Sequence, residues 1–147
     1  MRRALGLDVG DKTVGLAHSD ALGITAQGLP TVRRTSLAAD LEAVAAVCAE
    51  HSVEVLVVGL PLNMDGTEGP RAQKSRRFGD AVAAKVGLPV EYQDERLTTV
   101  QAERVLLDAD VSRQKRKKVI DMIAAQVILQ SWMDAQSFRP SGSSEEP

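Results

Sequence analysis

The stretch from Val53 to Leu60 constrains the fold of this chain more than any other part of the sequence. Apart from Glu54 and Gly59, all of its residues are apolar. Strands of parallel sheets are buried on both faces, and they therefore have such near-continuous apolar sequences. A sheet that is buried on both faces needs helices on each side, so this stretch favours an α/β architecture.

Helical patterns precede and follow this strand. Ser36 is a favoured N-cap residue for a helix that is predicted to extend to about Glu50. The apolar residues of that helix recur at helical spacing and form its predicted buried face: Leu37, Leu41, Val44 and Cys48. Pro70 suits the first turn of a second helix, which is predicted to run to about Val86 because Gly87 follows.

The N-terminal residues predict a β-hairpin. Residues 3–9 and residues 13–19 have strand-like sequences, and a turn over residues 10–12 joins them. Gly6 and Gly15 fall in the strand interiors, where glycine indicates that another backbone or a ligand approaches closely.

Two further strands complete the predicted sheet. A short strand is expected within residues 22–32, interrupted by Gly28 and Pro30, and residues 90–94 predict the last strand. An antiparallel hairpin that is followed by parallel strands gives a mixed five-stranded sheet with helices on its faces.

The C-terminal part of the chain is predicted to be helical. A capping box predicts a helix from Thr98 to about Leu107, and a last long helix is expected over about 113–136. Residues 1–138 are expected to form one domain. Residues 139–147 are Pro, Ser, Gly and Glu after Arg139, which predicts a disordered tail.

The composition excludes several classes of function. The net charge of the 147 residues is only -2, so nucleic-acid binding would require local clusters of Lys and Arg. Aromatic residues make up only 3%, which argues against a stacking platform for single strands. The single Cys48 excludes an internal disulfide and a Cys-based zinc site. Because the sequence has no targeting segment and no membrane-length apolar run, we expect a cytoplasmic protein.

Three carboxylates fall where a ligand site is expected. Asp8 lies inside the apolar first strand, and Glu95 ends the fifth. Open α/β sheets bind ligands at the carboxyl ends of their strands. Asp121 heads a stripe of the last helix that is otherwise typical of a buried face: Ala125, Ile128 and Trp132. The alternatives are a surface ion pair for Glu95 and compensation of the helix dipole for Asp121.

Clustered carboxylates repel one another unless a cation lies between them. Ligands that are all oxygen atoms suit Mg²⁺ or Mn²⁺ and disfavour zinc. Two such ions about 3.5–4 Å apart can promote the hydrolysis of a phosphodiester. Asp8, Glu95 and Asp121 therefore predict a site for Mg²⁺ or Mn²⁺, although their positions in the sequence alone do not show that they converge.

Basic residues supply the clue to the substrate. One cluster precedes Asp121 and consists of Arg113, Lys115, Arg116, Lys117 and Lys118, and a second opens the middle helix with Arg71, Lys74, Arg76 and Arg77. Cations near a helix N-terminus oppose the helix dipole, whereas a nucleic-acid backbone would stabilise them. Lys12, in the turn beside Asp8, is a further candidate phosphate contact. The alternative is two solvated helix faces.

Other familiar sites are absent or weakly indicated. Neither His18 nor His51 has a second His or a Cys at ligand spacing, so both are expected to be structural. The chain has no Gly-x-x-x-x-Gly-Lys-Ser/Thr loop, which argues against a P-loop nucleotide site. The Asp-x-Gly pattern at Asp8 also occurs in actin-like ATPases, but that class needs two lobes and this chain has the length of one.

Three blocks of the sequence carry a resemblance to a known family: Gly6–Ala17, Val57–Thr67 and Asp94–Thr99. Together with Ile120–Asp121 they resemble the YqgF-type proteins, described as Holliday-junction-resolvase-like nucleases or pre-16S rRNA nucleases. The similarity covers roughly residues 4–135. Met122 departs from the family pattern, in which a small polar residue is expected beside the third acid.

The resemblance implies an RNase H-like fold and a metal-dependent endonuclease that acts on structured nucleic acid. Asp8 and Asp121 would hold the metal, with Glu95 as a further ligand or as the base that positions water. Gly10 and Gly15 would leave room for metal and phosphate. Asn63 and Arg96 are added to the candidate nucleic-acid contacts, which also include Lys12, Arg71, Lys74 and the cluster at 113–118.

The family further implies processing of the 5′ end of the 16S rRNA precursor in ribosome biogenesis. Resolution of Holliday junctions in DNA recombination and repair is the alternative. A third possibility is a non-catalytic RNA-binding factor of ribosome assembly, because a fold does not fix a function. A junction has two scissile strands and favours a homodimer, whereas a single RNA end is compatible with a monomer.

Overall fold

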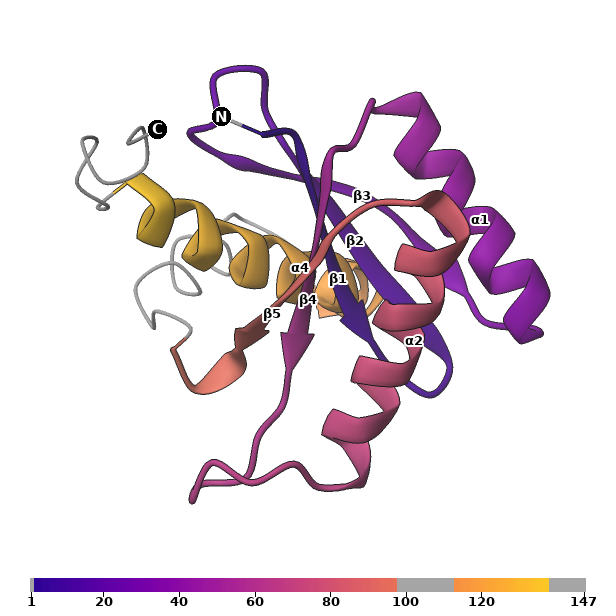
Figure 1. Ribbon diagram of the computed structural model, residues 1–147, viewed down its shortest axis with the longest axis vertical. Coiled ribbons are helices and arrows are strands. Elements are labelled where there is room, and N and C mark those ends of the chain that lie inside the picture. Colours follow the sequence, from indigo (N-terminus) through magenta and orange to yellow (C-terminus); the bar gives the residue numbers. More distant parts are fainter. Residues whose placement is uncertain (1, 98–112, 138–147) are drawn as a thin grey trace.

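β1 (Ala4–Val9) lies at the centre of a five-stranded mixed sheet (Figure 1). The computed structural model describes residues 2–97 and 113–137. The strand order is β3-β2-β1-β4-β5. β1 pairs antiparallel with β2 and parallel with β4, and β5 extends the sheet parallel to β4. The other strands are β2 (Thr13–Ser19), β3 (Ala26–Arg33), β4 (Val55–Leu60) and β5 (Val90–Asp94). The expected mixed sheet is confirmed.

Helices cover both faces of this sheet. Those on one face are α1 (Leu37–Glu50) and α2 (Pro70–Val86), and α4 (Arg113–Ser137) covers the other (Figure 1). A short 3-10 turn, η1 (Glu95–Leu97), follows β5. The predicted caps are confirmed: Ser36 accepts a hydrogen bond from the Ala39 amide at 3.2 Å, and Gly87 has a φ of 70°.

Side-chain alternation along β1 assigns each residue to a layer. Leu5, Leu7 and Val9 are buried in the core that α1 and α2 cover. Ala4 lies in the second core, beneath α4. Gly6 lies on the α4 side too, because a Cβ added there would lie 2.8 Å from the Cβ of Leu129. Asp8 therefore points toward the α4 side of the sheet.

The glycines of the hairpin allow α4 to approach the sheet. A Cβ on Gly15 would overlap the backbone carbonyl of Asp121, so only glycine fits there. The expectation that another backbone approaches Gly6 and Gly15 is confirmed. The expectation that Gly15 leaves room for metal and phosphate is wrong, because the backbone of α4 fills that space.

The structure corrects two details of the predicted elements. β3 has eight residues and continues through Gly28 and Pro30, where an interruption was expected. It does so at the edge of the sheet with a change of register, since Val14 pairs with Val32 but Leu16 pairs with Leu29. An edge strand with an extra residue tolerates the missing N–H of proline.

Leu37 is the second correction. It was assigned to the buried face of the first helix, but it is 54% exposed, because it occupies the first turn, beyond the packed part of α1. Cys48 is buried in the core as expected. The helix predicted over 98–107 and the tail at 139–147 lie outside the described residues.

Candidate active site

The three candidate acids lie at the same end and on the same face of the sheet. Asp8 is near the carboxyl end of β1 and faces the α4 side, where Gly15 is its partner on β2. Gly15 in turn contacts the backbone of Asp121. Glu95 follows β5 directly, and its Oε2 lies 3.0 Å from where a Cβ of Gly59 in β4 would stand. Three separate elements therefore bring Asp8, Glu95 and Asp121 into one region.

The electrostatics show that the carboxylates interact. Burial raises the pKa of Asp8 above its ordinary value, and the negative charge of Asp121 raises it further. Burial also raises the pKa of Glu95, with a second contribution from the charge of Asp8 and a smaller one from Asp94. Asp8 is thus coupled to both of the other acids, and this is the repulsion that a bound cation would relieve.

Arg71 is the cation that partly compensates this repulsion. It lies in the first turn of α2, and its charge lowers the pKa of both Asp8 and Glu95. Its side chain remains exposed. An exposed guanidinium close to clustered carboxylates is well placed to bind a phosphate that enters the site. The sequence predicted Arg71 as a phosphate contact, but its closeness to the acids follows only from the fold.

Thr13 is a site residue that the sequence analysis missed. Its Oγ1 donates a 2.8 Å hydrogen bond to Oδ2 of Asp121, which fixes that carboxylate on α4 relative to β2. The alternation of side chains in the hairpin could have predicted this position. Asp8 faces Gly15 across the hairpin, and Thr13 is two residues from Gly15. Thr13 therefore shares the face that carries Asp8.

The donor set of this region consists of carboxylate oxygens, which suits a hard divalent cation. Within residues 2–97 and 113–137, no three His, Cys, Asp or Glu side chains are gathered tightly enough to form a ready metal cluster. Asp8 and Glu95 are half-buried and mutually repulsive. Their charges and donor atoms fit a cation that would draw the carboxylates closer together.

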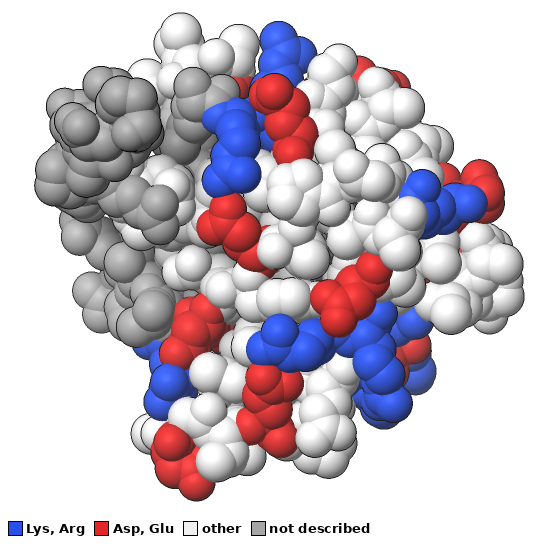
Figure 2. Space-filling view, in the orientation of Figure 1, with Lys and Arg blue, Asp and Glu red and all other residues white. Residues whose placement is uncertain are grey.

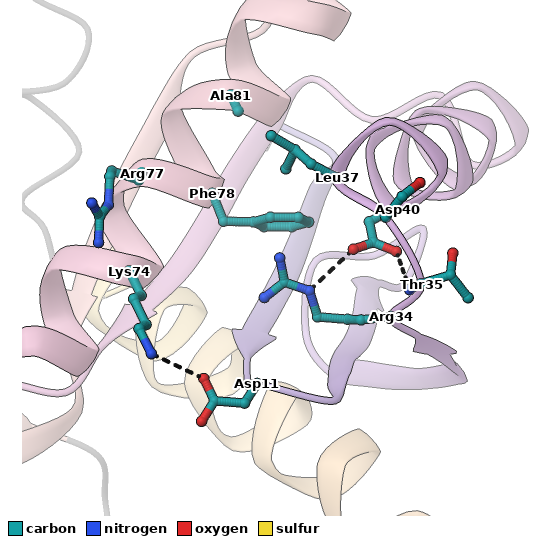
Figure 3. Close-up of a pocket in the computed structure, with 10 residues that line it drawn as sticks. Asp11, Arg34, Thr35, Leu37, Asp40, Lys74, Arg77, Phe78 and Ala81 are labelled. Atoms are coloured by element: carbon teal, nitrogen blue, oxygen red, sulfur yellow. Dashed lines mark hydrogen bonds and ion pairs between the residues drawn. The ribbon is translucent and has the colours of Figure 1, made fainter.

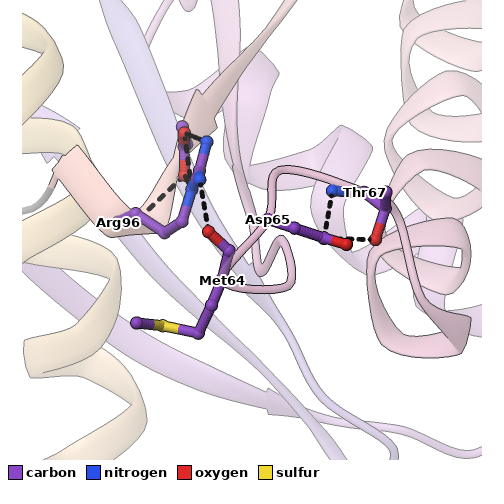
Figure 4. Close-up of polar contacts among 5 residues, drawn as sticks. Met64, Asp65, Thr67 and Arg96 are labelled. Carbon is purple, nitrogen blue, oxygen red and sulfur yellow. Dashed lines mark hydrogen bonds and ion pairs between the residues drawn. The ribbon is translucent and has the colours of Figure 1, made fainter.

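Arg96, which follows Glu95, forms contacts with two neighbouring segments. The ion pair there joins Arg96 to Asp94, with an Nη2–Oδ2 distance of 2.8 Å, and does not involve Glu95. The guanidinium also donates from Nη1 to the backbone carbonyl of Met64 at 3.2 Å (Figure 4). Arg96 thus connects the end of β5 to the loop that follows β4. The hypothesis of a surface ion pair fits Asp94 rather than Glu95.

Asn63 contributes to the same loop. Its side-chain amide donates to Oγ1 of Thr67 at 2.9 Å, and its backbone amide donates to the Thr67 carbonyl at 2.9 Å. These contacts give Asn63 a role in shaping the loop. They do not bring it into contact with Asp8, Glu95 or Asp121.

The remaining basic candidates lie in the β1–β2 turn, on α2 and in the first residues of α4. Lys12 is exposed in the turn that joins β1 to β2. Lys74 lies one turn beyond Arg71, and its Nζ is 3.4 Å from Asp11. Figure 2 shows Lys and Arg gathered over α2 beside Asp and Glu. The first residues of α4 include Arg113, Lys115, Arg116, Lys117 and Lys118, whose side chains lie outside the described part of the structure.

A pocket of about 530 Å³ opens between α1 and α2 (Figure 3). These helices cover the face of the sheet opposite to the one toward which Asp8 points. Arg34 dominates this pocket, and its Nε lies 3.1 Å from Asp40 while its guanidinium stacks 4.8 Å from the Phe78 ring. Arg34 also donates to the Gly10 carbonyl at 2.9 Å. This last contact holds the turn that follows β1.

Neither histidine approaches the acids. The rings of His18 and His51 stack on each other with centroids 4.3 Å apart, which fits the structural role that was expected. In the part of the chain that the structure describes, no helix has the length and apolarity required to cross a membrane.

Comparisons with solved structures confirm the RNase H-like fold. Thermus thermophilus RuvC in complex with a Holliday junction substrate aligns with a TM-score of 0.58 and 14% identity, over 94% of this chain and 97% of that chain. The fowlpox virus resolvase, also solved with Holliday junction DNA, has a TM-score of 0.58 and 14% identity, over 91% and 98% of the two chains. At this level of identity the likeness concerns the fold alone.

Sequence comparisons find relatives of much higher identity than the solved structures. A protein of Myxococcus xanthus (strain DK1622) with the name "Putative pre-16S rRNA nuclease" is 59% identical over 150 residues, which cover 99% of each chain. Residues 2–135 match the family model RuvX, whose description is Holliday junction resolvase. This chain therefore belongs to the RuvX family.

Proposed function

We propose that this protein is a metal-dependent endonuclease that cleaves phosphodiester bonds in structured nucleic acid. The observation that carries this proposal is the charge coupling of Asp8 to Asp121 and of Glu95 to Asp8 at one end of the sheet. A fold gains little stability from half-buried, mutually repulsive carboxylates, so their convergence favours a functional explanation. The RuvX family and the RuvC-like fold support the same conclusion.

The residues of the site have separate tasks in this proposal. Asp8 and Asp121 would hold Mg²⁺ or Mn²⁺, and Thr13 keeps the Asp121 carboxylate in one orientation. When bound, a pair of such ions lowers the pKa of water and stabilises negative charge on the phosphate. Glu95 would act as a further ligand or as the base that positions water, because a raised pKa makes a carboxylate a better proton acceptor. Arg71 would contact a phosphate oxygen.

The proposed substrate is the 5′ end of the 16S rRNA precursor, and the proposed location is the cytoplasm. The names of the close relatives favour this substrate. A second candidate, resolution of Holliday junctions, is favoured by the description of the family model. The two differ in symmetry, because a junction has two equivalent scissile strands and suits a homodimer, whereas one RNA end suits a monomer.

Cleavage assays would test the proposal directly. An RNA that spans the mature 5′ end of 16S rRNA and a four-way DNA junction would each be incubated with protein in Mg²⁺, in Mn²⁺ and in EDTA. We expect cleavage only with a divalent ion, and we expect Asp8→Asn and Asp121→Asn to lose at least about a hundredfold in rate. Asp11→Asn, an exposed carboxylate three residues from Asp8, is the matched control and should cleave normally.

Cleavage by Asp8→Asn at the wild-type rate would refute the assignment of the active site. Preference for the RNA over the junction would support the rRNA function, and the reverse would support the resolvase. The mass of the protein in solution, measured with each substrate bound, would show whether one or two chains act together.

A further inference from the structure

Met64 is exposed to an unusual degree. Its side chain is 94% exposed, more than any other large apolar side chain in the described residues; the next is Leu22 at 78%. Keeping an apolar side chain in water contributes nothing to the stability of the fold, whereas burying it against a partner is favourable. A binding partner that covers Met64 would provide that burial.

The loop that carries Met64 is held by its own hydrogen bonds. Thr67 donates from its amide to Asp65 at 3.0 Å and from its hydroxyl to the same oxygen at 2.7 Å (Figure 4). The Gly66 amide donates to the Asn63 carbonyl at 2.8 Å, and Gly66 has a φ of 89° that favours glycine. The loop from Asn63 to Thr67 therefore presents Met64 from a defined backbone.

This loop is also tied to the segment that carries Glu95. Arg96 follows Glu95 in the chain, donates to the Met64 carbonyl, and is itself held by Asp94. In Figure 4 the Met64 side chain points away from Arg96 and from the contacts between Asp65 and Thr67. Because β1 and β4 are parallel, the loop after β4 emerges at the end of the sheet where Asp8 lies.

We propose that Met64 packs against an unstacked nucleobase next to the phosphate that is cleaved. Apolar side chains such as Met and Leu insert between base steps in other complexes, and a thioether packs well on an aromatic ring. An intact duplex offers no free base face, so the protein would prefer sites where a base is unpaired or easily unstacked. This inference rests on the proposed function and adds to it a reason for acting on structured rather than uniform duplex nucleic acid.

The test uses the full chain with Asp8→Asn, which allows binding to be measured without cleavage. The probe is the RNA of the cleavage assay, with the fluorescent base 2-aminopurine placed in turn at each nucleotide beside the cleaved bond. We expect one position to change its fluorescence on binding. Adding Met64→Ala should abolish that change and raise the Kd about tenfold. Adding Met64→Leu instead should preserve the fluorescence change and leave the Kd near that of the Asp8→Asn protein.

Leu22→Ala is the matched control, because Leu22 is also exposed but follows β2 at the opposite end of the sheet. It should leave both the fluorescence change and the Kd unaltered. In the chain with Asp8 intact, Met64→Ala should raise KM while changing kcat little. Its unfolding temperature should equal that of the wild type, because the side chain contributes no packing.

The inference is overturned if Met64→Ala keeps the fluorescence change and the Kd, or if Leu22→Ala weakens binding equally. A wild-type protein that never cleaves would refute the proposed nuclease activity and the inference with it, because no bond is then cleaved beside the base. Cleavage by the wild type without any Met64-dependent signal would overturn the inference alone. Failure of the Asp8→Asn protein to bind the RNA at all would overturn the inference, whereas cleavage by the wild type would still support the proposed function.

Discussion

At the scale of single residues, Asp8 carries an electrostatic cost in the folded protein. Its folded-state pKa lies above the ordinary value of 3.8, so the folded protein binds a proton more tightly than the unfolded chain. The ionised carboxylate therefore destabilises the fold. This penalty is absent at pH values below 3.8 and grows as the pH rises toward the folded-state pKa.

We therefore predict that Asp8→Asn stabilises the metal-free protein while it abolishes cleavage. In EDTA at neutral pH, its unfolding temperature should exceed that of the wild type by roughly 2–4 °C, the effect of about 1 kcal/mol in a domain of this size. Thermal unfolding followed by circular dichroism between pH 3 and pH 8 would measure this, and the difference should shrink at the acidic end. A lower unfolding temperature for Asp8→Asn at neutral pH would show that the carboxylate stabilises the fold.

Thr13 makes a second prediction at this scale. Thr13→Val removes the hydroxyl that bonds to the Asp121 carboxylate but keeps the branched shape of the side chain. We expect kcat to fall about tenfold with a smaller change in KM, since a hydrogen bond to a charged group contributes roughly 1.5–3 kcal/mol. Thr13→Ser keeps the hydroxyl and should restore most of the rate in the same cleavage assay. A wild-type rate for Thr13→Val would show that the hydrogen bond to Asp121 is dispensable, and equal losses in both variants would show that the hydroxyl alone does not account for the effect.

At the scale of elements, the contact between β2 and α4 positions the third acid. Gly15→Ala would place a methyl group against the Asp121 carbonyl, and because backbone on both sides cannot yield, α4 must shift. Overpacking of this kind costs roughly 1–3 kcal/mol. Urea unfolding should show that loss of stability, and the surviving folded protein should cleave poorly.

Gly87→Ala is the appropriate control for that experiment. Its added Cβ would meet nothing within 4 Å, so the cost is limited to the strain of a φ of 70°, about 1 kcal/mol. Its cleavage rate should match that of the wild type. If Gly15→Ala were as active as Gly87→Ala, the approach of α4 to the sheet would not be what places Asp121.

At the scale of the whole molecule, the net charge of -2 cannot attract nucleic acid, so local basic clusters must do so. We predict that changing Lys115, Arg116 and Lys117 to Gln weakens binding and makes its dependence on salt shallower by about 2–3 units of the logarithmic slope, roughly 0.7–0.9 unit for each of three lost phosphate contacts. Binding titrations across a range of salt concentrations would measure it.

Lys85→Gln is the control for the basic cluster. Lys85 pairs with Glu42 at 2.6 Å near the end of α2, and its removal should leave the slope unchanged. An unchanged slope in the triple variant would assign Lys115, Arg116 and Lys117 to an ordinary solvated helix face.

The sequence by itself predicted most of the elements and proposed which acids form the site. Apolar runs predicted the strands, and helical spacing and caps predicted α1 and α2. The positions of Asp8 and Glu95 near strand ends follow from the same local pattern. The interruption of β3 was mispredicted, because whether a strand tolerates Pro30 depends on its place at the sheet edge.

The tertiary structure alone decided how distant segments meet. Thr13 bonds to Asp121 across 108 positions of sequence, the charge of Arg71 on α2 lowers the pKa of Asp8 and Glu95, and Arg96 donates to the carbonyl of Met64. Local periodicity specifies which face of an element is apolar, but it does not specify which partner covers that face. That partner is chosen by packing of the complete chain, and in this protein the glycines of the hairpin let α4 lie close enough to bring Asp121 to Asp8.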